Sequence, residues 1–368
     1  MKRFKTTVAA ALTAVALLGS LGFTAACGPE DAAEPAAQAY VSPYDWSGLE
    51  RSGDRLAFRE NGEVRSQLGV DVSDHQGAID WSAVASEGVD FATLQGSEIL
   101  KADLPPFIAV PTTAGTGSEV TLVAVVADTH KHAKLSFTSY KLVPHVAILD
   151  PALTSSLPPK LTATTGMDAL THAVEAHTSI QKNPVSDAFA AKAVALIAAN
   201  LPTACRNGAD TEARTSLALA SLMAGAAFSN AMVGIVHAIG HSLGGLCRIP
   251  HGQAMMMLLP HCVRFNLDRG IHAGLYGQLL DVLAPARAAA LGAGAAPEAL
   301  DRAFLDELTA LNDLFHREYG VPLTLSELGV SRDDLPAVAK QARYDGAALY
   351  NETEITLEDA MAVLEAAY

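Results

Sequence analysis

From residue 156 to the last residue, the chain repeats apolar residues at the spacing of helices that pack one face into a core. Strand-like alternation is missing from this stretch, so the pattern predicts a mainly helical fold for residues 156–368. The segments with the clearest helical spacing are 165–174, 188–199, 215–228, 298–315 and 357–367.

Two apolar runs that precede this helical stretch, 107–110 and 143–149, are predicted to be strands. The first runs directly into a turn rich in Gly and Thr, with the sequence PTTAGTGSEVT at 111–121. A turn of this kind after a strand offers backbone amides and hydroxyls to a polar ligand, although such turns also serve only to reverse the chain. Both interpretations stay open at this point.

The composition excludes several classes of protein. Half of the 368 residues are apolar and 18% are charged, which excludes a chain that is disordered throughout. The formal charge of −15 is opposite in sign to the field that attracts nucleic acid, so we expect no nucleic-acid partner. Four cysteines without a C-x-x-C pair do not make a disulfide scaffold, and we expect them to be reduced and without a metal.

The first residues have the pattern of an export signal. Basic residues precede an apolar run over 8–23, and small residues then precede Cys27. This pattern resembles a bacterial lipoprotein signal over 1–27, with Cys27 as the acylated residue, and an uncleaved anchor is the alternative. The Ala/Pro/Glu-rich residues 28–44 are predicted to be a flexible linker. We therefore expect an exported protein that contacts the membrane only through a lipid on Cys27.

Residues 45–98 are predicted to form a βαβ fragment, with strands at 69–73 and 89–94. The sequence GVDVSDHQGAIDWSAVASEGVDFATLQ resembles the start of the barrel-fold muramidase lysozymes over about 45–95. In that family the aspartate at the position of Asp71 lies in the active site. The family also needs an Asp-x-Glu on a later strand, and residues 45–98 contain none. Because glycoside hydrolysis uses two carboxylates, we expect no lysozyme activity.

Histidines and one aspartate share helical faces in the apolar half of the chain. Asp168 and His172 are four residues apart, as are His237 and His241, and His251 follows Pro250 where a helix can begin. Polar groups in such apolar segments are costly to bury unless they are used. A carboxylate with imidazoles suits divalent ions such as Fe²⁺ or Zn²⁺. We expect the histidines without such companions to be structural or exposed: His130, His132, His145, His177, His261, His272 and His316.

Six stretches of the sequence are distinctive enough to compare with known families. They are PTTAGTGSEVT, DPALTSSLPP, TGMDALTHAVEAH, NAMVGIVHAIGHSLGG, PHGQAMMMLLPHCVRFN and LEDAMAVLEAAY. Together they resemble the iron-containing (group III) alcohol dehydrogenases, over about 104–368. The resemblance implies hydride transfer between a small alcohol or aldehyde and NAD or NADP, in a cytoplasmic family, and it allows a homo-oligomer.

The resemblance also implies the site residues. The family holds its metal, Fe²⁺ or Zn²⁺, with one aspartate and three histidines. These positions correspond here to Asp168, His172, His237 and His251. His241 corresponds to a histidine beside the substrate, which we expect to relay a proton. In the family, a threonine-rich turn lines the nicotinamide cofactor, and its positions correspond here to Thr112, Thr113 and Thr116.

One family motif is missing from the sequence. The family binds the pyrophosphate with a Gly-Gly-Gly-Ser loop, whereas the only Gly-Gly here is Gly244-Gly245. We therefore expect residues 99–155 to be a remnant of the dinucleotide-binding α/β region, truncated or replaced by the segments before it. Residues 156–368 are then the helical, metal-binding catalytic domain of a chimera.

Three functions remain at this stage. The favoured one is a metal-dependent alcohol dehydrogenase, possessing a metal site but impaired in cofactor binding. The second is a fragment of an exported peptidoglycan hydrolase of the lysozyme type. The third is a metal-binding module without catalysis, which the missing phosphate loop favours.

Overall fold

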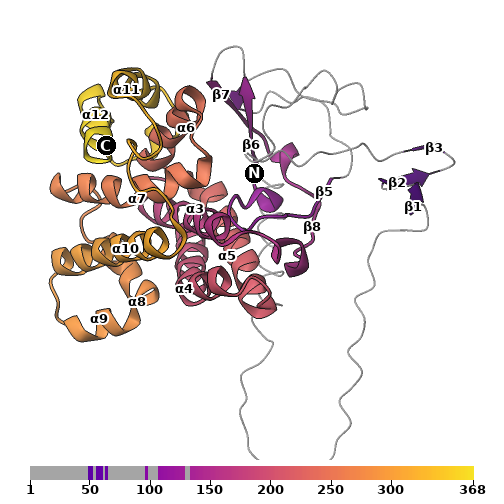
Figure 1. Cartoon of the computed structure of the whole chain (residues 1–368), viewed down its shortest axis with the longest axis horizontal. Coiled ribbons are helices and arrows are strands. Elements are labelled where there is room, and N and C mark those ends of the chain that lie inside the picture. The colour runs from indigo at the N-terminus through magenta and orange to yellow at the C-terminus, as the bar shows by residue number, and fades with distance from the viewer. Residues whose placement is uncertain (1–48, 53–54, 61–62, 65–95, 98–106, 129–132) are drawn as a thin grey trace, which may run out of the picture. The chain divides into compact units, whose positions relative to one another are not determined.

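The computed structural model describes residues 49–52, 55–60, 63–64, 96–97, 107–128 and 133–368 (Figure 1). The predicted signal, the linker and most of the lysozyme-like fragment, including Cys27 and Asp71, lie outside the described residues. Those assignments stay predictions.

The described strands are short and form three small sheets. β5 (Ile108–Ala109) pairs in parallel with β8 (Val146–Ala147), so both apolar runs predicted as strands contain one. A second sheet has the order β4-β7-β6, and a third has the order β1-β2-β3. Their strands are β1 (Leu49–Ser52), β2 (Arg55–Glu60), β3 (Glu63–Val64), β4 (Gly96–Ser97), β6 (Val123–Asp128) and β7 (Ala133–Thr138).

Helices fill most of the chain from Pro159 onward, which confirms the predicted mainly helical fold. Each of the five segments with helical spacing lies largely within one of them. The helices are α3 (Pro159–Thr178), α4 (Pro184–Arg206), α5 (Thr211–Ala231), α6 (Ile235–Cys247), α7 (His251–Asp268), α8 (Leu280–Leu283), α9 (Pro285–Leu291), α10 (Pro297–Tyr319), α11 (Leu335–Arg343) and α12 (Leu357–Ala366).

The starts of several helices are fixed by local chemistry. Asn183 caps α4 and Thr356 caps α12, each in a reciprocal capping box that satisfies backbone N–H groups at the first turn. The Asp210 side chain accepts a hydrogen bond from the Ala213 N–H and caps α5. α3 begins with Pro159, whose missing N–H costs nothing at the first helical position.

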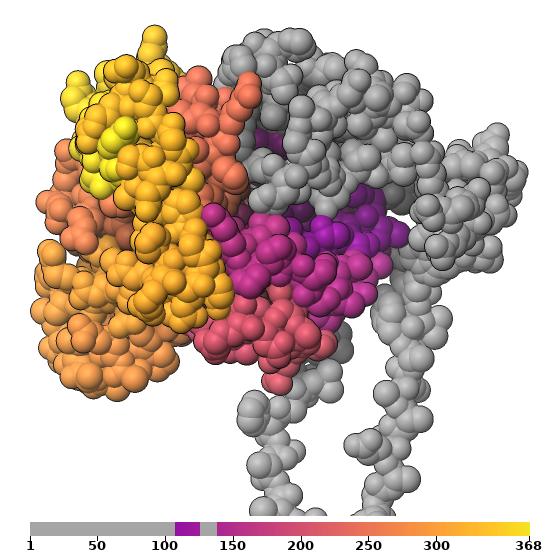
Figure 2. All heavy atoms as spheres, viewed as in Figure 1, coloured from indigo at the N-terminus to yellow at the C-terminus, as the bar shows by residue number. Residues whose placement is uncertain are grey.

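Helix α3 lies inside the helical domain, where it packs against α4, α5 and α7. Every residue from Gly166 to Thr178 is buried. Helix α4 is apolar and long enough to cross a membrane, and it packs along α3 and α5 with 39% of its apolar window buried. Side chains of α8 to α12, orange to yellow in Figure 2, cover one face of this domain. The polar residues of α3 are therefore enclosed by protein.

A sharp turn between α5 and α6 directs the start of α6 toward α3. The two helices are bent by 105° at the break between them. Met232 has a positive φ of 67°, and Gly234 opens α6. This turn brings the backbone of Val236 to a side chain of α3, Glu175, whose carboxylate accepts its N–H.

The threonine-rich turn packs directly on α5. Gly117 has a φ of 62°, which favours glycine, and its N–H donates to the Ser221 hydroxyl at 3.2 Å. A Cβ atom on Gly225 would lie 2.8 Å from the Gly117 carbonyl oxygen. The turn and the helix can approach this closely only because both positions are glycine.

We expect Gly225→Ala to destabilise the protein by about 1–3 kcal/mol, because the added methyl group meets backbone that must move. In an unobstructed helix the same change would stabilise it by about 0.5–1 kcal/mol, so the sign is diagnostic. Chemical denaturation measures the effect. Gly294→Ala is the control, because its Cβ would have no atom within 4 Å. Equal stability of Gly225→Ala and the parent chain would contradict the close contact.

Candidate metal centre

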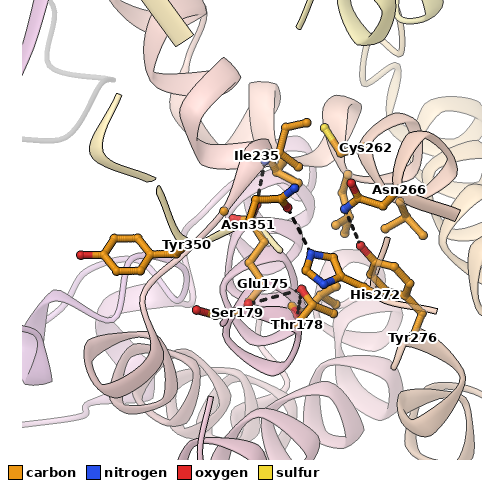
Figure 3. A pocket seen from close by; sticks show the side chains of 15 residues that line it. Glu175, Thr178, Ser179, Ile235, Cys262, Asn266, His272, Tyr276, Tyr350 and Asn351 are labelled. Atoms are coloured by element: carbon orange, nitrogen blue, oxygen red, sulfur yellow. Dashed lines mark hydrogen bonds between the residues drawn. The ribbon is translucent and has the colours of Figure 1, made fainter. Parts of the chain in front are cut away.

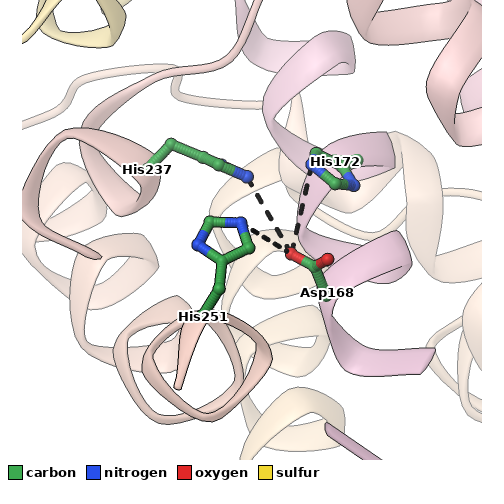
Figure 4. A group of neighbouring side chains, drawn as sticks. All are labelled: Asp168, His172, His237 and His251. Atoms are coloured by element: carbon green, nitrogen blue, oxygen red, sulfur yellow. Dashed lines mark ion pairs between the residues drawn. The ribbon is translucent and has the colours of Figure 1, made fainter. Parts of the chain in front are cut away.

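Four predicted ligands come together in the helical domain, from three helices (Figure 4). α3 contributes Asp168 and His172, α6 contributes His237, and α7 begins at His251. Oδ1 of Asp168 lies 4.0 Å from Nε2 of His172, 4.0 Å from Nε2 of His237 and 3.5 Å from Nε2 of His251. One ligand atom from each residue lies within 4.8 Å of all the others.

The two inner imidazoles are neutral in this environment. His172 and His237 are both buried, and burial disfavours their charged forms. Burial lowers the pKa of His172 to about 4 and holds the pKa of His237 well below its usual range. A neutral imidazole is the form that binds metal ions.

The same two imidazoles make a hydrogen bond through Nδ1. Nδ1–H of His172 donates to the Gly115 carbonyl oxygen at 3.2 Å, and Nδ1–H of His237 donates to the Glu175 carboxylate. In both cases Nε2 remains the atom that faces Asp168. This is the arrangement in which the Nδ1 partner sets the tautomer of a ligating histidine.

These four donors fit a divalent ion. Nε2 of His237 is buried and has no hydrogen-bond partner among the described residues, a situation that costs free energy unless something uses its lone pair. Ion-to-ligand distances of about 2 Å require donor atoms about 3–4 Å apart, and the three distances from Oδ1 of Asp168 to the imidazole nitrogens are 3.5–4.0 Å. A carboxylate with three imidazoles suits Fe²⁺ or Zn²⁺.

The cluster is most accessible beside His241 and His251. The side chain of His251 is 21% exposed and that of His241 is 13% exposed, against 3% for Asp168. The rings of His241 and His251 stack with centroids 5.6 Å apart. Nδ1–H of His241 donates to Oδ2 of Asp345 at 3.1 Å. The more exposed side of the cluster therefore carries an imidazole whose ring is oriented by Asp345.

Phe228 of α5 forms an apolar wall on the inner side. Its ring stacks on His172 with centroids 4.4 Å apart, and His172 in turn stacks on His237 at 4.6 Å. These contacts contribute to the burial of the two imidazoles, which is the largest cause of their lowered pKa values.

The predicted cofactor residues lie in the turn that also contacts His172. Thr112 and Thr116 are exposed and Thr113 is half-buried. The Thr116 hydroxyl donates to the Ser118 hydroxyl at 3.1 Å. Because Gly115 of the same turn accepts the His172 hydrogen bond, the threonines stand on a segment fixed to the ligand cluster.

Sequence reasoning missed Glu175, Asp345 and Gly115. Glu175 lies seven residues after Asp168, on the same face of α3, so helical spacing gave a signal for it. Asp345 gave none, because it is 104 residues from His241. Glu175 also lines a small polar cavity with Asn266, Asn351 and other side chains (Figure 3).

The histidines expected to be structural or exposed do not join this ligand cluster where they are described. The His145 ring accepts a hydrogen bond from the Phe107 N–H, and Nδ1–H of His316 donates to the Val321 carbonyl oxygen. His130 and His132 lie outside the described residues.

Comparison with known proteins places the chain in a family. The model of the "Fe-containing alcohol dehydrogenase family, C-terminal" matches residues 162–368, and that of "Iron-containing alcohol dehydrogenase" matches residues 78–151. The chain belongs to the iron-containing alcohol dehydrogenase family. The second match begins inside the segment 45–98 that resembles a lysozyme. Membership confirms the predicted class, an alcohol dehydrogenase-like oxidoreductase.

Relatives from several bacteria extend this similarity. The chain is 43% identical to a 1,3-propanediol dehydrogenase of Citrobacter freundii over 73% of this chain and 66% of the relative, or about two thirds of its length. It is 37% identical to an NAD-dependent methanol dehydrogenase of Bacillus methanolicus over 80% of this chain and 74% of the relative. The crystal structure of a 1,3-propanediol oxidoreductase matches with a TM-score of 0.69 and 39% identity, over 76% of this chain and 70% of that one.

The described cysteines stay outside the ligand cluster. Cys205 and Cys262 are buried, Cys247 is partly buried, and none of the three forms a disulfide. Burial raises the pKa of the Cys205 thiol to about 12 and the pKa of the Cys262 thiol well above its usual range. Only the thiolate is a nucleophile, so both are inert in the folded protein.

We expect the Cys205 and Cys262 peptides to remain unmodified when the folded chain is treated with iodoacetamide at pH 8.5. Both should be modified rapidly in urea, where the pKa returns to about 8.5. Mass spectrometry of each peptide provides the readout, and the Cys247 peptide, partly buried, is the internal reference. Modification of Cys205 at the same rate with and without urea would contradict its burial.

Proposed function

We propose that this chain is a metal-dependent alcohol dehydrogenase whose divalent ion, Fe²⁺ or Zn²⁺, is held by four side chains. The observation that carries the proposal is the convergence of one carboxylate oxygen and three imidazole nitrogens inside an apolar domain. The four are Asp168, His172, His237 and His251.

A divalent ion in this cluster would supply a Lewis acid that lowers the proton affinity of an alcohol oxygen. The chain's own residues supply charge, exclude water and admit the alcohol. Asp168 supplies the negative charge, and Phe228 excludes water from the inner side. The exposed edge formed by His241 and His251 is the side from which the alcohol enters.

His241 is proposed to receive the proton of the alcohol hydroxyl. Its Nδ1–H donates to Asp345, which leaves the lone pair of Nε2 as the base. The same imidazole returns the proton when an aldehyde is reduced. Asp345 keeps the ring oriented through Oδ2, while its Oδ1 accepts the Ala347 N–H at 2.9 Å.

The hydride acceptor is proposed to be NAD or NADP, bound with its nicotinamide beside Thr112, Thr113 and Thr116. The exposed hydroxyls of this turn and its bond to His172 support the assignment. The substrate is proposed to be a small alcohol or its aldehyde. Two relatives are named for such alcohols, 1,3-propanediol and methanol.

The hydrolase alternative has little support. The single Asp-x-Glu of the chain, Asp210 to Glu212, begins α5, and Asp210 serves there as a helix cap. The third alternative is a metal-binding module without catalysis. A measurement of alcohol oxidation distinguishes it from the proposed dehydrogenase, because both would bind the ion. Export with a lipid on Cys27 remains a separate proposal, supported by the signal-like sequence of residues 1–27.

We expect the purified full chain to bind about one divalent ion and to gain thermal stability on binding it. His237→Ala should weaken the affinity more than about 100-fold, because even the loss of an outer partner of a ligand costs about 10–100-fold. Metal analysis after dialysis and titration with Zn²⁺ provide the readouts. His316→Ala, a histidine bonded to the Val321 carbonyl outside the cluster, is the control. Equal metal content in the parent and His237→Ala would contradict the ligand set.

We expect oxidation of small alcohols to depend on NAD or NADP weakly and without clear saturation. The sequence lacks the Gly-Gly-Gly-Ser loop of the family, and two or three lost phosphate contacts of about 1.5–3 kcal/mol each weaken binding by on the order of a thousandfold. Calorimetric titration with each dinucleotide checks this expectation. A family-type dinucleotide-binding half joined in front of Leu104 should restore tight binding. Micromolar affinity in the unaltered chain would refute it.

A further inference from the structure

The acidic side chain of α3 that sequence reasoning missed lies on the same face as two proposed ligands. Asp168, His172 and Glu175 stand at positions i, i+4 and i+7, so one stripe of the helix carries all three. Glu175 is only 5% exposed. A carboxylate this deeply buried needs partners for both of its oxygens.

Both oxygens of Glu175 are used, and both partners are at the start of α6. Oε1 accepts the Val236 N–H at 2.7 Å, and Oε2 accepts Nδ1–H of His237. Gly234, at the N-cap of α6, has no side chain to cap this helix. A carboxylate from another helix therefore takes that place.

A capping function explains only one of these two contacts. One oxygen satisfies the backbone N–H, while the other is engaged by the side chain of a proposed ligand. An ionised carboxylate can only accept, so this contact requires the proton of His237 on Nδ1 and leaves the lone pair on Nε2. Nε2 is buried and without a hydrogen-bond partner in the described part of the chain. Nε2 lies 4.0 Å from Oδ1 of Asp168.

The Nδ1 acceptor of His237 also differs in kind from that of its neighbour. His172 donates to a neutral backbone carbonyl, that of Gly115, whereas His237 donates to a carboxylate. A carboxylate acceptor makes the imidazole a more basic ligand as well as fixing its tautomer. The stacked rings of His172 and His237 therefore differ in the charge of their Nδ1 acceptors.

We infer that Glu175 is a positioning residue for the metal centre, which acts through His237 by fixing its tautomer, its ring orientation and its basicity. This inference rests on the proposed function, because it requires the metal site. Glu175 does not itself contact the ion or the substrate.

Glu175→Gln is the sharpest variant because it keeps the size of the side chain. A glutamine has one oxygen for two donors, so either Val236 or His237 loses its acceptor. We expect the affinity of the metal-free full chain for Zn²⁺ to fall about 10–100-fold, measured by competition with a chromophoric chelator. Affinity within about twofold of the parent chain overturns the inference.

Asp301→Asn is the matched control for stability. Asp301 is 2% exposed, and its carboxylate accepts the N–H groups of Gly274 and Gly277, both at 2.6 Å. Its hydrogen-bond partners in the described part of the chain are backbone groups and not histidines. We expect this variant to lower the melting temperature while leaving Zn²⁺ affinity unchanged. Equal losses of affinity in both variants would mean that the effect of Glu175 is structural only.

A double-mutant cycle tests whether Glu175 acts through His237. In the His237→Ala background, Glu175→Gln should cause no further loss of the remaining Zn²⁺ affinity. Additive losses would overturn the inference. If the parent chain binds no Zn²⁺, the proposed metal centre fails first, a result that differs from binding that is unaffected by Glu175→Gln.

The parent chain offers a measurement that needs no variant of Glu175. Long-range ¹H–¹⁵N spectra of the metal-free chain report which imidazole nitrogen carries the proton, and His237→Ala assigns the signal. We expect a protonated Nδ1 and an unprotonated Nε2 on His237. A proton on Nε2 instead would overturn the inference even if Glu175→Gln failed to fold.

Discussion

The cost of taking polar groups out of water determines how this domain is built. A carboxylate and two imidazoles lie deep among apolar helices, where an unpaired charge is not tolerated. The imidazoles are neutral, each directs a proton to an acceptor through Nδ1, and each turns Nε2 toward Asp168. Both acceptors, the Gly115 carbonyl and the Glu175 carboxylate, come from outside the ligand set.

Close approach of backbone is the second requirement, and glycine provides it. The turn that supplies the acceptor of His172 rests on α5 through Gly117 and Gly225. At the start of α6, a Cβ on Gly234 would lie 3.2 Å from Oε1 of Glu175, tighter than most such contacts. At both places a glycine without a side chain allows close packing. The packing brings the Gly115 carbonyl within hydrogen-bonding distance of His172 and the Glu175 carboxylate within hydrogen-bonding distance of His237.

Periodicity predicted helices such as α5 and α10 because apolar residues recur along one buried side of each. Segment 215–228, for example, lies within α5, although the cap at Asp210 extends that helix beyond the periodic residues. Spacing of four residues paired Asp168 with His172 and His237 with His241, because such spacing is a local property of a helix. The choice of four ligands among these residues and His251 came from the family resemblance. The partners of those positions were not predictable. Gly115 is 57 residues from His172, and Asp345 is 104 residues from His241, so only the folded chain reveals them.

The hydrogen bond between His172 and Gly115 connects the proposed metal site to the proposed cofactor site. His172 belongs to the ligand cluster and Gly115 to the turn that carries the threonines. A ligand that orders the turn also restrains the His172 imidazole through this bond, and a ligand that restrains the imidazole also orders the turn. Thermodynamic reciprocity makes any coupling between two bound ligands equal in both directions. An ion and a dinucleotide bound as proposed would be linked through this one contact.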